Sequence, residues 1–316
     1  MTGELSDVVE LLRCPVCAGS FGTPESGAGP ARGDSVTRPA RLVSLRCDNG
    51  HTFDVARQGY VSLLDGRSAS LRADTAAMVA ARARVHDTGF FTCVVDAVAD
   101  RTRRFGTDVP RPVVLDAGAG GGHYLRAAVA ALGDDARGIG IDLSKYCARA
   151  IARGTPPHAA IVADIWRGLP MADEGVTVAL SVFAPRNGAE FARVLRPDGA
   201  LIVVSPEADH LAEVVGPMKM LRVDAAKSER LHAALDEHFE VIESAPVRAV
   251  VDVDAATVGD LVAMGPSAFH SEESDIRSRA ADLVGTGTIP VAVSVLVTTC
   301  RPKVRGRRAV AQRSTD

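Results

Sequence analysis

The chain has 316 residues, 47% of them hydrophobic and 24% charged, and its formal net charge is −3 at pH 7. Such a composition is typical of globular proteins, and the length suits one large domain with a small accessory unit. The negative net charge excludes a protein that attracts nucleic acid through an overall basic field, so contact with RNA would need a local basic patch. The N-terminus, Met1–Leu12, is acidic and unlike a secretion signal, and no apolar run approaches the roughly 20 residues of a membrane span. The sequence therefore predicts a cytoplasmic protein with no membrane contact.

Residues 1–65 predict a small lobe built around one structural zinc ion. Cys14-Pro-Val-Cys17 and Cys47-Asp-Asn-Gly-His51 supply two pairs of candidate ligands, each with the spacing of zinc sites. Three cysteines and one histidine complete a tetrahedral shell and leave no position for a catalytic water. The ion would stabilise a lobe too small to fold on its own core. The alternative interpretation is free thiols beside an unrelated histidine.

Three segments outside the main domain have distinct compositions. The stretch Gly22–Pro39, between the ligand pairs, is rich in glycine, proline and serine and predicts a flexible loop. Residues 66–108 predict a helical connector, in which Asp74 or Asp87 is expected to cap a helix. The tail, 303–316, is basic without an apolar period and is expected to be disordered.

Residues 109–302 predict an α/β domain. Short β-branched runs alternate with helical segments, which is the pattern of a doubly wound, Rossmann-like, mostly parallel sheet. The last two strands lack a comparable helix behind the final one and predict an antiparallel edge hairpin. The expected strands are Pro112–Asp116, Gly138–Asp142, Ala160–Asp164, Val176–Val182, Ala200–Ser205, Val241–Asp252 and Pro290–Thr299. The expected helices include His123–Ala131, Lys145–Arg153 and Ala189–Leu195.

A glycine turn after the first of these strands predicts a nucleotide site. The run Val113-Val-Leu-Asp116-Ala-Gly118-Ala-Gly120-Gly121-Gly122-His123 joins an apolar strand to a helix. Its glycines allow a sharp turn and close approach of a ligand, as they also do in NAD enzymes. Here, however, an acid precedes the loop where hydride-transfer folds usually place the first glycine. A carboxylate at that point suits the methionine ammonium of S-adenosylmethionine, so Asp116, Gly118, Gly120 and Gly121 are candidate contacts of that cofactor.

The next two strands also end in acids. Asp142 is expected to accept hydrogen bonds from the ribose hydroxyls, and Asp164 to bind the adenine amino group with Ile165 or Trp166 against the ring. The alternative is that these acids only cap the helices that follow them. The three strands would present their acids at the sheet edge where such folds bind ligands.

The N-terminal motif resembles the RlmA family of 23S rRNA guanine-N1 methyltransferases, which includes the tylosin-resistance enzymes of actinomycetes. The similarity is most specific where Cys14-Pro-x-Cys17 is followed by Cys47-x-x-Gly-His51-Thr-Phe53-Asp54-Val-Ala56-Arg57-x-Gly59-Tyr60. It continues to about Pro302 through Met78–Arg84, Asp87–Phe91, the glycine turn, Val182–Asn187, Leu195–Gly199, Ser205–Pro206, His210–Leu211 and Met264–Pro266.

The resemblance implies a class I methyltransferase sheet that binds S-adenosylmethionine and a zinc lobe that helps to grip a 23S rRNA hairpin, hairpin 35. Its cofactor contacts would correspond to Phe91, Gly120, Gly121 and His210. Arg82 and Arg84 become candidate contacts to RNA phosphates. A homodimer is a further expectation.

The loop after the fourth strand, Ala184-Pro185-Arg186-Asn187, supplies the candidate catalytic residues. Guanine N1 carries a proton, so methyl transfer requires either a base or stabilisation of negative charge on the purine. Arg186 is expected to stabilise charge at O6 and Asn187 to orient the base; the sequence identifies no general base. Two other functions stay open: a methyltransferase for small molecules, which the acidic net charge favours, and a non-catalytic RNA-binding protein.

Overall fold

The computed structural model describes residues 5–22, 42–64, 72–184, 186–221 and 235–303. The loop predicted over Gly22–Pro39 and the tail predicted to be disordered therefore lie almost entirely outside the described residues. Among the described residues, no helix combines the length and apolar character that a bilayer crossing requires.

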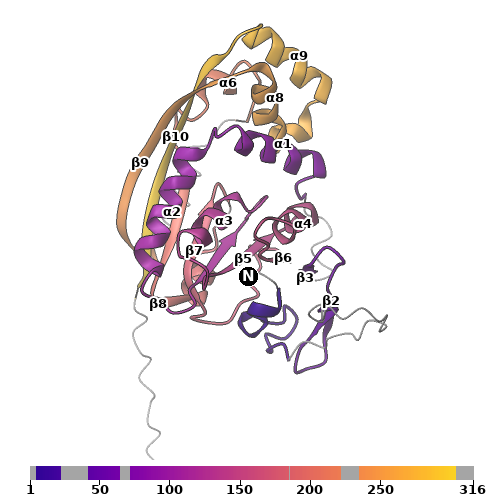
Figure 1. The fold of residues 1–316 in the computed structure, drawn as a ribbon, viewed down its shortest axis with the longest axis vertical. Coiled ribbons are helices and arrows are strands. Elements are labelled where there is room, and N and C mark those ends of the chain that lie inside the picture. Colours follow the sequence, from indigo (N-terminus) through magenta and orange to yellow (C-terminus); the bar gives the residue numbers. More distant parts are fainter. Residues whose placement is uncertain (1–4, 23–41, 65–71, 185, 222–234, 304–316) are drawn as a thin grey trace, which may run out of the picture.

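An eight-stranded sheet forms the body of the protein, in the order β3-β6-β5-β4-β7-β8-β10-β9 (Figure 1). Its first six strands in this order are parallel, and β10 is antiparallel to both of its neighbours. Central strands such as β4 and β7 are buried at every position, as expected for a sheet covered on both faces. The strands are β3 Tyr60–Ser62, β4 Val113–Ala117, β5 Arg137–Asp142, β6 Ala159–Val162, β7 Val176–Val182, β8 Leu195–Pro206, β9 Phe239–Val253 and β10 Ile289–Pro302. The predicted mostly parallel α/β fold is confirmed.

The antiparallel edge differs from a simple hairpin. β10 lies between β8 and β9, and it pairs with β9 from Ile289 opposite Val253 to Pro302 opposite Phe239. The chain between these strands passes through two α-helices, α8 (Ala255–Ala263) and α9 (Glu273–Val284), instead of a tight turn.

Helices cover both faces of the sheet. The described helices are α1 Ala76–Asp87, α2 Thr92–Gly106, α3 His123–Ala130, α4 Lys145–Ala152, α5 Gly188–Val194, α6 Ala212–Val215, α8 Ala255–Ala263 and α9 Glu273–Val284, with 3-10 helices η1 Leu5–Leu11 and η2 Pro266–His270. One apolar core joins α2, α3 and α8 to the sheet, and a second lies on the opposite face, where η1 packs against β5 and β6. Figure 1 shows α8, drawn in gold, beside the purple α1 although the two are far apart in sequence.

The predicted helix caps at Asp74 and Asp87 are wrong. α1 begins at Thr75, whose hydroxyl accepts a hydrogen bond of 3.2 Å from the amide of Met78. Asp74 instead forms an ion pair with Arg82 at 2.6 Å. α2 begins after Phe91 with no side-chain cap.

The N-terminal lobe is joined to the large sheet by a strand of its own. β1 (Ser44–Arg46) and β2 (Thr52–Asp54) form a separate antiparallel pair, whereas β3, although also within residues 1–65, pairs in parallel with β6. Val61 at its centre is fully buried. The N-terminal lobe and the large α/β domain therefore share one sheet.

Candidate functional site: a metal centre and a cavity at the sheet edge

The four predicted zinc ligands come together. The donor atoms of Cys14, Cys17, Cys47 and His51 all lie within 4.8 Å of one another. The Sγ atoms of Cys17 and Cys47 are 3.7 Å apart, and His51 Nδ1 lies 3.4 Å from Cys47 Sγ and 3.7 Å from Cys14 Sγ. A tetrahedral ion with bonds of about 2.0–2.3 Å separates its ligands by about 3.5 Å, so this set fits zinc. A complete Cys₃His shell indicates a structural site.

Two tight turns place these ligands. In the first, the amide of Ala18 donates to the carbonyl of Cys14 at 2.8 Å; in the second, the amide of Gly50 donates to the carbonyl of Cys47 at 2.8 Å. The Asn49 amide hydrogen-bonds to Cys17 Sγ at 3.3 Å and lowers the pKa of that thiol to about 6. This favours the thiolate, which is the form that binds metal.

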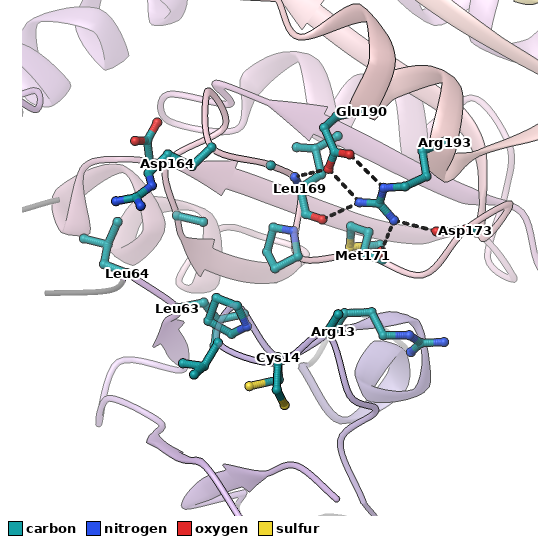
Figure 2. A pocket seen from close by; sticks show the side chains of 18 residues that line it. Arg13, Cys14, Leu63, Leu64, Asp164, Leu169, Met171, Asp173, Glu190 and Arg193 are labelled. Carbon is teal, nitrogen blue, oxygen red and sulfur yellow. Dashed lines mark hydrogen bonds and ion pairs between the residues drawn. The ribbon is translucent and has the colours of Figure 1, made fainter. Parts of the chain in front are cut away.

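The zinc lobe faces the loop between β6 and β7 across a cavity of about 710 Å³ (Figure 2). On the far wall, Arg193 is held by Glu190 and Asp173, each at 2.7 Å, and it donates to two carbonyls of the same loop. On the lobe side, the amide of Arg13 donates to the carbonyl of Pro170 at 2.9 Å. The turn that carries Cys14 is thus tied to the loop that follows Asp164.

A second cavity, of about 570 Å³, opens at the carboxyl ends of the parallel strands. This volume lies within the range of small-molecule sites. Six of the eight predicted cofactor contacts line it: Phe91, Gly118, Gly120, Asp142, Asp164 and His210. Gly118 has a φ of +83°, and a Cβ there would lie 2.5 Å from that of Ala184, so only glycine permits this turn.

The other two predicted contacts lie just outside the lining. Gly121 packs against the ring of His123, which a Cβ would meet at 2.8 Å. Asp116 is wholly buried beneath the turn, and neither of its carboxylate oxygens has a hydrogen-bond partner among the described residues. Burial, reinforced by Asp142, raises the pKa of Asp116 to about 8. Tyr124 lines the cavity, and its hydroxyl is also buried, with no hydrogen-bond partner among the described residues.

Asp142 and Asp164 both make local contacts as well as lining the cavity. Asp142 accepts hydrogen bonds from the amides of Gly120 at 2.9 Å and Ser144 at 2.8 Å, so it supports the glycine turn. Asp164 accepts from the amide of Trp166 at 3.0 Å. The indole of Trp166, the only tryptophan of the chain, is 59% exposed and lines the same cavity.

Arg82 is a cavity residue whose position the sequence did not predict. Its guanidinium donates to the carbonyl of Met264 at 2.8 Å and pairs with Asp74. A Cβ on Gly120 would lie 3.0 Å from its Nη1. Arg84, the other expected phosphate contact, forms a two-point ion pair with Asp260 at 2.6 and 2.7 Å. Met264 and Asp260 are almost two hundred residues away from these arginines along the chain, and no local pattern indicates them.

Burial lowers the pKa of four histidines: to about 3 for His86 and to about 4 for His123, His158 and His210. His86 and His123 stack with centroids 4.0 Å apart. His210 Nδ1 accepts a hydrogen bond of 3.2 Å from the amide of Ser294, so its proton resides on Nε2. His210 is therefore neutral and offers the cavity a hydrogen-bond donor.

The two candidate catalytic residues do not line this cavity. Arg186 is buried, and its guanidinium donates to Ser205 Oγ at 2.7 Å. Asn187 caps α5, accepting from the amide of Glu190 at 3.4 Å, while its own amide donates to the carbonyl of Trp166 at 3.2 Å. Both side chains brace the loop after β7, and the expected contact of Arg186 with guanine O6 does not fit this placement.

Comparisons with known proteins agree with both sites. Residues 40–67 match the family described as "RlmA, N-terminal", and residues 115–203 match "Methyltransferase domain". The chain is 43% identical to the 23S rRNA (guanine(748)-N(1))-methyltransferase of Streptomyces fradiae, over 94% of this chain and 98% of that protein. A relative from Micromonospora griseorubida, provisionally named a 23S rRNA (guanine-N(1)-)-methyltransferase, is 42% identical over 91% of this chain and 96% of its own length.

The fold and its cavity define an S-adenosylmethionine-dependent methyltransferase that carries a structural zinc lobe. More particularly, identity along almost the whole length of these relatives shows that the chain belongs to the RlmA-type 23S rRNA guanine-N1 methyltransferase family.

Proposed function

We propose that this protein transfers the methyl group of S-adenosylmethionine to N1 of one guanine in hairpin 35 of 23S rRNA. The observation that carries the proposal is 43% identity, over 94% of the chain, to a relative named for this reaction. The match includes the zinc lobe as well as the cofactor domain, which favours an RNA substrate over a small molecule.

The cavity residues fit the cofactor from one end to the other. Asp142 and Asp164 lie where the ribose and adenine are expected, with Trp166 beside them. At the opposite end, the unpartnered carboxyl of Asp116 suits the methionine ammonium, because a buried acid without a partner gains most from a cation. Arg82, which reaches over Gly120, suits the methionine carboxylate.

S-Adenosylmethionine supplies an electrophilic methyl group on its sulfonium. The chain contributes alignment for an in-line displacement, which accounts for much of the rate in such reactions. His210 acts as a donor through Nε2 and not as the base, because its pKa is near 4 and its other nitrogen is occupied by Ser294. The N1 proton of guanine leaves before or during the transfer, and water is its acceptor.

A stripe of exposed basic residues on α4 supplies local positive charge for RNA, although the net charge of the chain is negative. Lys145, Arg149 and Arg153 recur at every fourth residue along α4 and its C-terminal cap, and all three are exposed. The described part of the chain places no carboxylate in an ion pair with any of them. Lys145 also borders a hollow that shares Asp74 and Leu143 with the cofactor cavity. This stripe is suited to the phosphates that flank the target hairpin.

Primer extension on 23S rRNA tests the proposal. RNA from cells that carry the gene should give a stop one nucleotide before the modified guanine, because a methyl group at N1 blocks pairing. Cells that carry an Asp142→Ala variant provide the matched control and should show a greatly weakened stop. An unmodified hairpin in cells where the wild-type protein is shown to bind cofactor would favour the small-molecule alternative. Tylosin-type resistance and a homodimer stay predictions, to be tested by growth on the macrolide and by sedimentation.

A further inference from the structure

Phe183 occupies an unusual position at the end of β7. It has a φ of +53°, in the left-handed region that residues with a Cβ rarely adopt. The conformation is held by a hydrogen bond of 3.2 Å from its amide to the carbonyl of Val204, and by Ala184, which packs against the glycine turn. Strain of this kind persists where the surrounding structure enforces it and is often found at functional sites.

The strained backbone leaves an aromatic ring exposed in the cofactor cavity. Val182 before it is buried, yet the side chain of Phe183 is 41% exposed and lines the cavity. Phe91 and His210 support the ring, with centroid distances of 5.9 Å and 5.7 Å. An apolar ring that is supported by its neighbours but remains open to solvent is suited to stack on a planar ligand.

Strand order separates this ring from the adenine end of the cavity. The glycine turn follows β4; β5 and β6 lie on one side of β4, and β7 lies on the other. Asp142 ends β5, and Asp164 and Trp166 follow β6, whereas Phe183 follows β7. The two exposed aromatic side chains of the cavity therefore lie on opposite sides of the turn, and the planar ligand beside Phe183 is not the cofactor's adenine.

We propose that Phe183 stacks on the target guanine once that base has left its own stack, an inference that rests on the proposed function. Extrusion of a base sacrifices its stacking, and an aromatic side chain restores part of it. Phe91, which contacts the ring of Phe183, is itself a predicted cofactor contact. A purine stacked on Phe183 would therefore lie close to the methyl group.

Binding of hairpin RNA to the full-length protein, saturated with S-adenosylhomocysteine, tests this role. The RNA is the 23S hairpin with either the target guanine or an abasic nucleotide at that position. Phe183→Ala should weaken binding of the guanine RNA about five- to hundredfold, the range for loss of one base–aromatic stack. It should leave binding of the abasic RNA unchanged. Phe183→Tyr should retain most of the affinity, whereas Phe183→Leu, which keeps apolar volume without the ring, should behave like alanine.

Two controls separate stacking from other effects. Fluorescence of Trp166, the only tryptophan, reports cofactor binding, which should be equal in wild type and the Phe183 variants. Tyr146→Ala removes another exposed aromatic ring, 37% exposed on α4, and should leave the guanine-to-abasic ratio as in wild type. An equal loss on both RNAs, or a loss of S-adenosylhomocysteine affinity that accounts for the effect, would overturn the role of Phe183. Wild-type protein that does not methylate the rRNA at all would overturn the proposed function, and this inference with it.

Discussion

Asp116→Asn replaces a buried, unpartnered carboxyl group with a neutral side chain of the same shape. Because burial raises the pKa of Asp116 to about 8, this group is mostly protonated in the folded protein at pH 7, whereas an unfolded chain holds it ionised. The folded pKa lies above the unfolded one. The contribution of Asp116 to stability is therefore fully present below pH 3.8 and is lost as the pH rises towards 8.

The size of this loss follows from the two pKa values. The difference between pH 7 and the ordinary pKa of 3.8 corresponds to about 4 kcal/mol of unfolding free energy, at ~1.4 kcal/mol per pH unit. Asparagine has no such charging cost. The cofactor-free variant should therefore be more stable than wild type at pH 7, by at most that amount, and the advantage should disappear near pH 4. The same change should weaken cofactor binding, because the ammonium loses its counter-charge.

Urea unfolding of wild type and variant between pH 4 and pH 8 measures the stability difference. Calorimetric titration with S-adenosylmethionine at pH 7, in two buffers of different ionisation enthalpy, measures protons released on binding. Wild type should release protons as the bound cation lowers the pKa of Asp116, and the variant should release fewer. A stability difference that does not vary with pH, or equal proton release by both proteins, would refute the reasoning.

Three further predictions concern the metal, the cofactor turn and the buried histidines. Metal analysis should find one zinc per chain, lost in Cys14→Ser and kept in the control Cys93→Ser; stoichiometric zinc in a Cys14/Cys47 double variant would contradict the ligand assignment. Asp142→Ala should weaken S-adenosylmethionine binding roughly ten- to hundredfold in calorimetry, the loss of a charged hydrogen-bond pair worth ~1.5–3 kcal/mol. Asp142→Asn, which removes the charge but keeps an acceptor for the Gly120 amide, should lose less; equal losses would show that the charge alone, and not support of the glycine turn, accounts for the effect. His86, His123, His158 and His210 have folded pKa values below the ordinary 6.5. Their contribution to the stability of the protein is present above pH 6.5 and should fall as the pH drops towards 4, by up to ~1.4 kcal/mol per pH unit for each. His158→Leu should flatten that fall in urea unfolding, and an unchanged slope would show that His158 does not titrate.

Local patterns were sufficient for the features that depend on short stretches of chain. The strand that ends at Asp142 and the zinc ligand pairs follow from periodicity and spacing, because a strand buried on both faces must be apolar and a chelate turn must be short. The glycine turn is equally local, because Gly118, Gly120 and Gly122 all have a positive φ, which favours glycine.

Features that arise from distant contacts could not be predicted in this way. The sequence suggested Arg82 as a contact to RNA phosphates, but α8 packs against α1 and brings the carbonyl of Met264 to its guanidinium. Arg186 was expected to stabilise charge at guanine O6, yet its guanidinium is buried and donates to Ser205 on the neighbouring strand. Residues 60–62 were assigned to the zinc lobe with no strand predicted, and a strand of three residues is too short to reveal that it pairs with β6.

The position of β10 has a consequence for how the enzyme is made. Translation produces β9 before β10, so the longest strand of the sheet emerges while the partner beside it has not yet been synthesised. The same late strand supplies the Ser294 amide that fixes His210 in the cofactor cavity. A nascent chain that lacks β10 therefore has an unfinished active site as well as an open sheet. We expect methylation only from completed chains, so a ribosome would be modified by finished enzyme and not by the chain it is still producing.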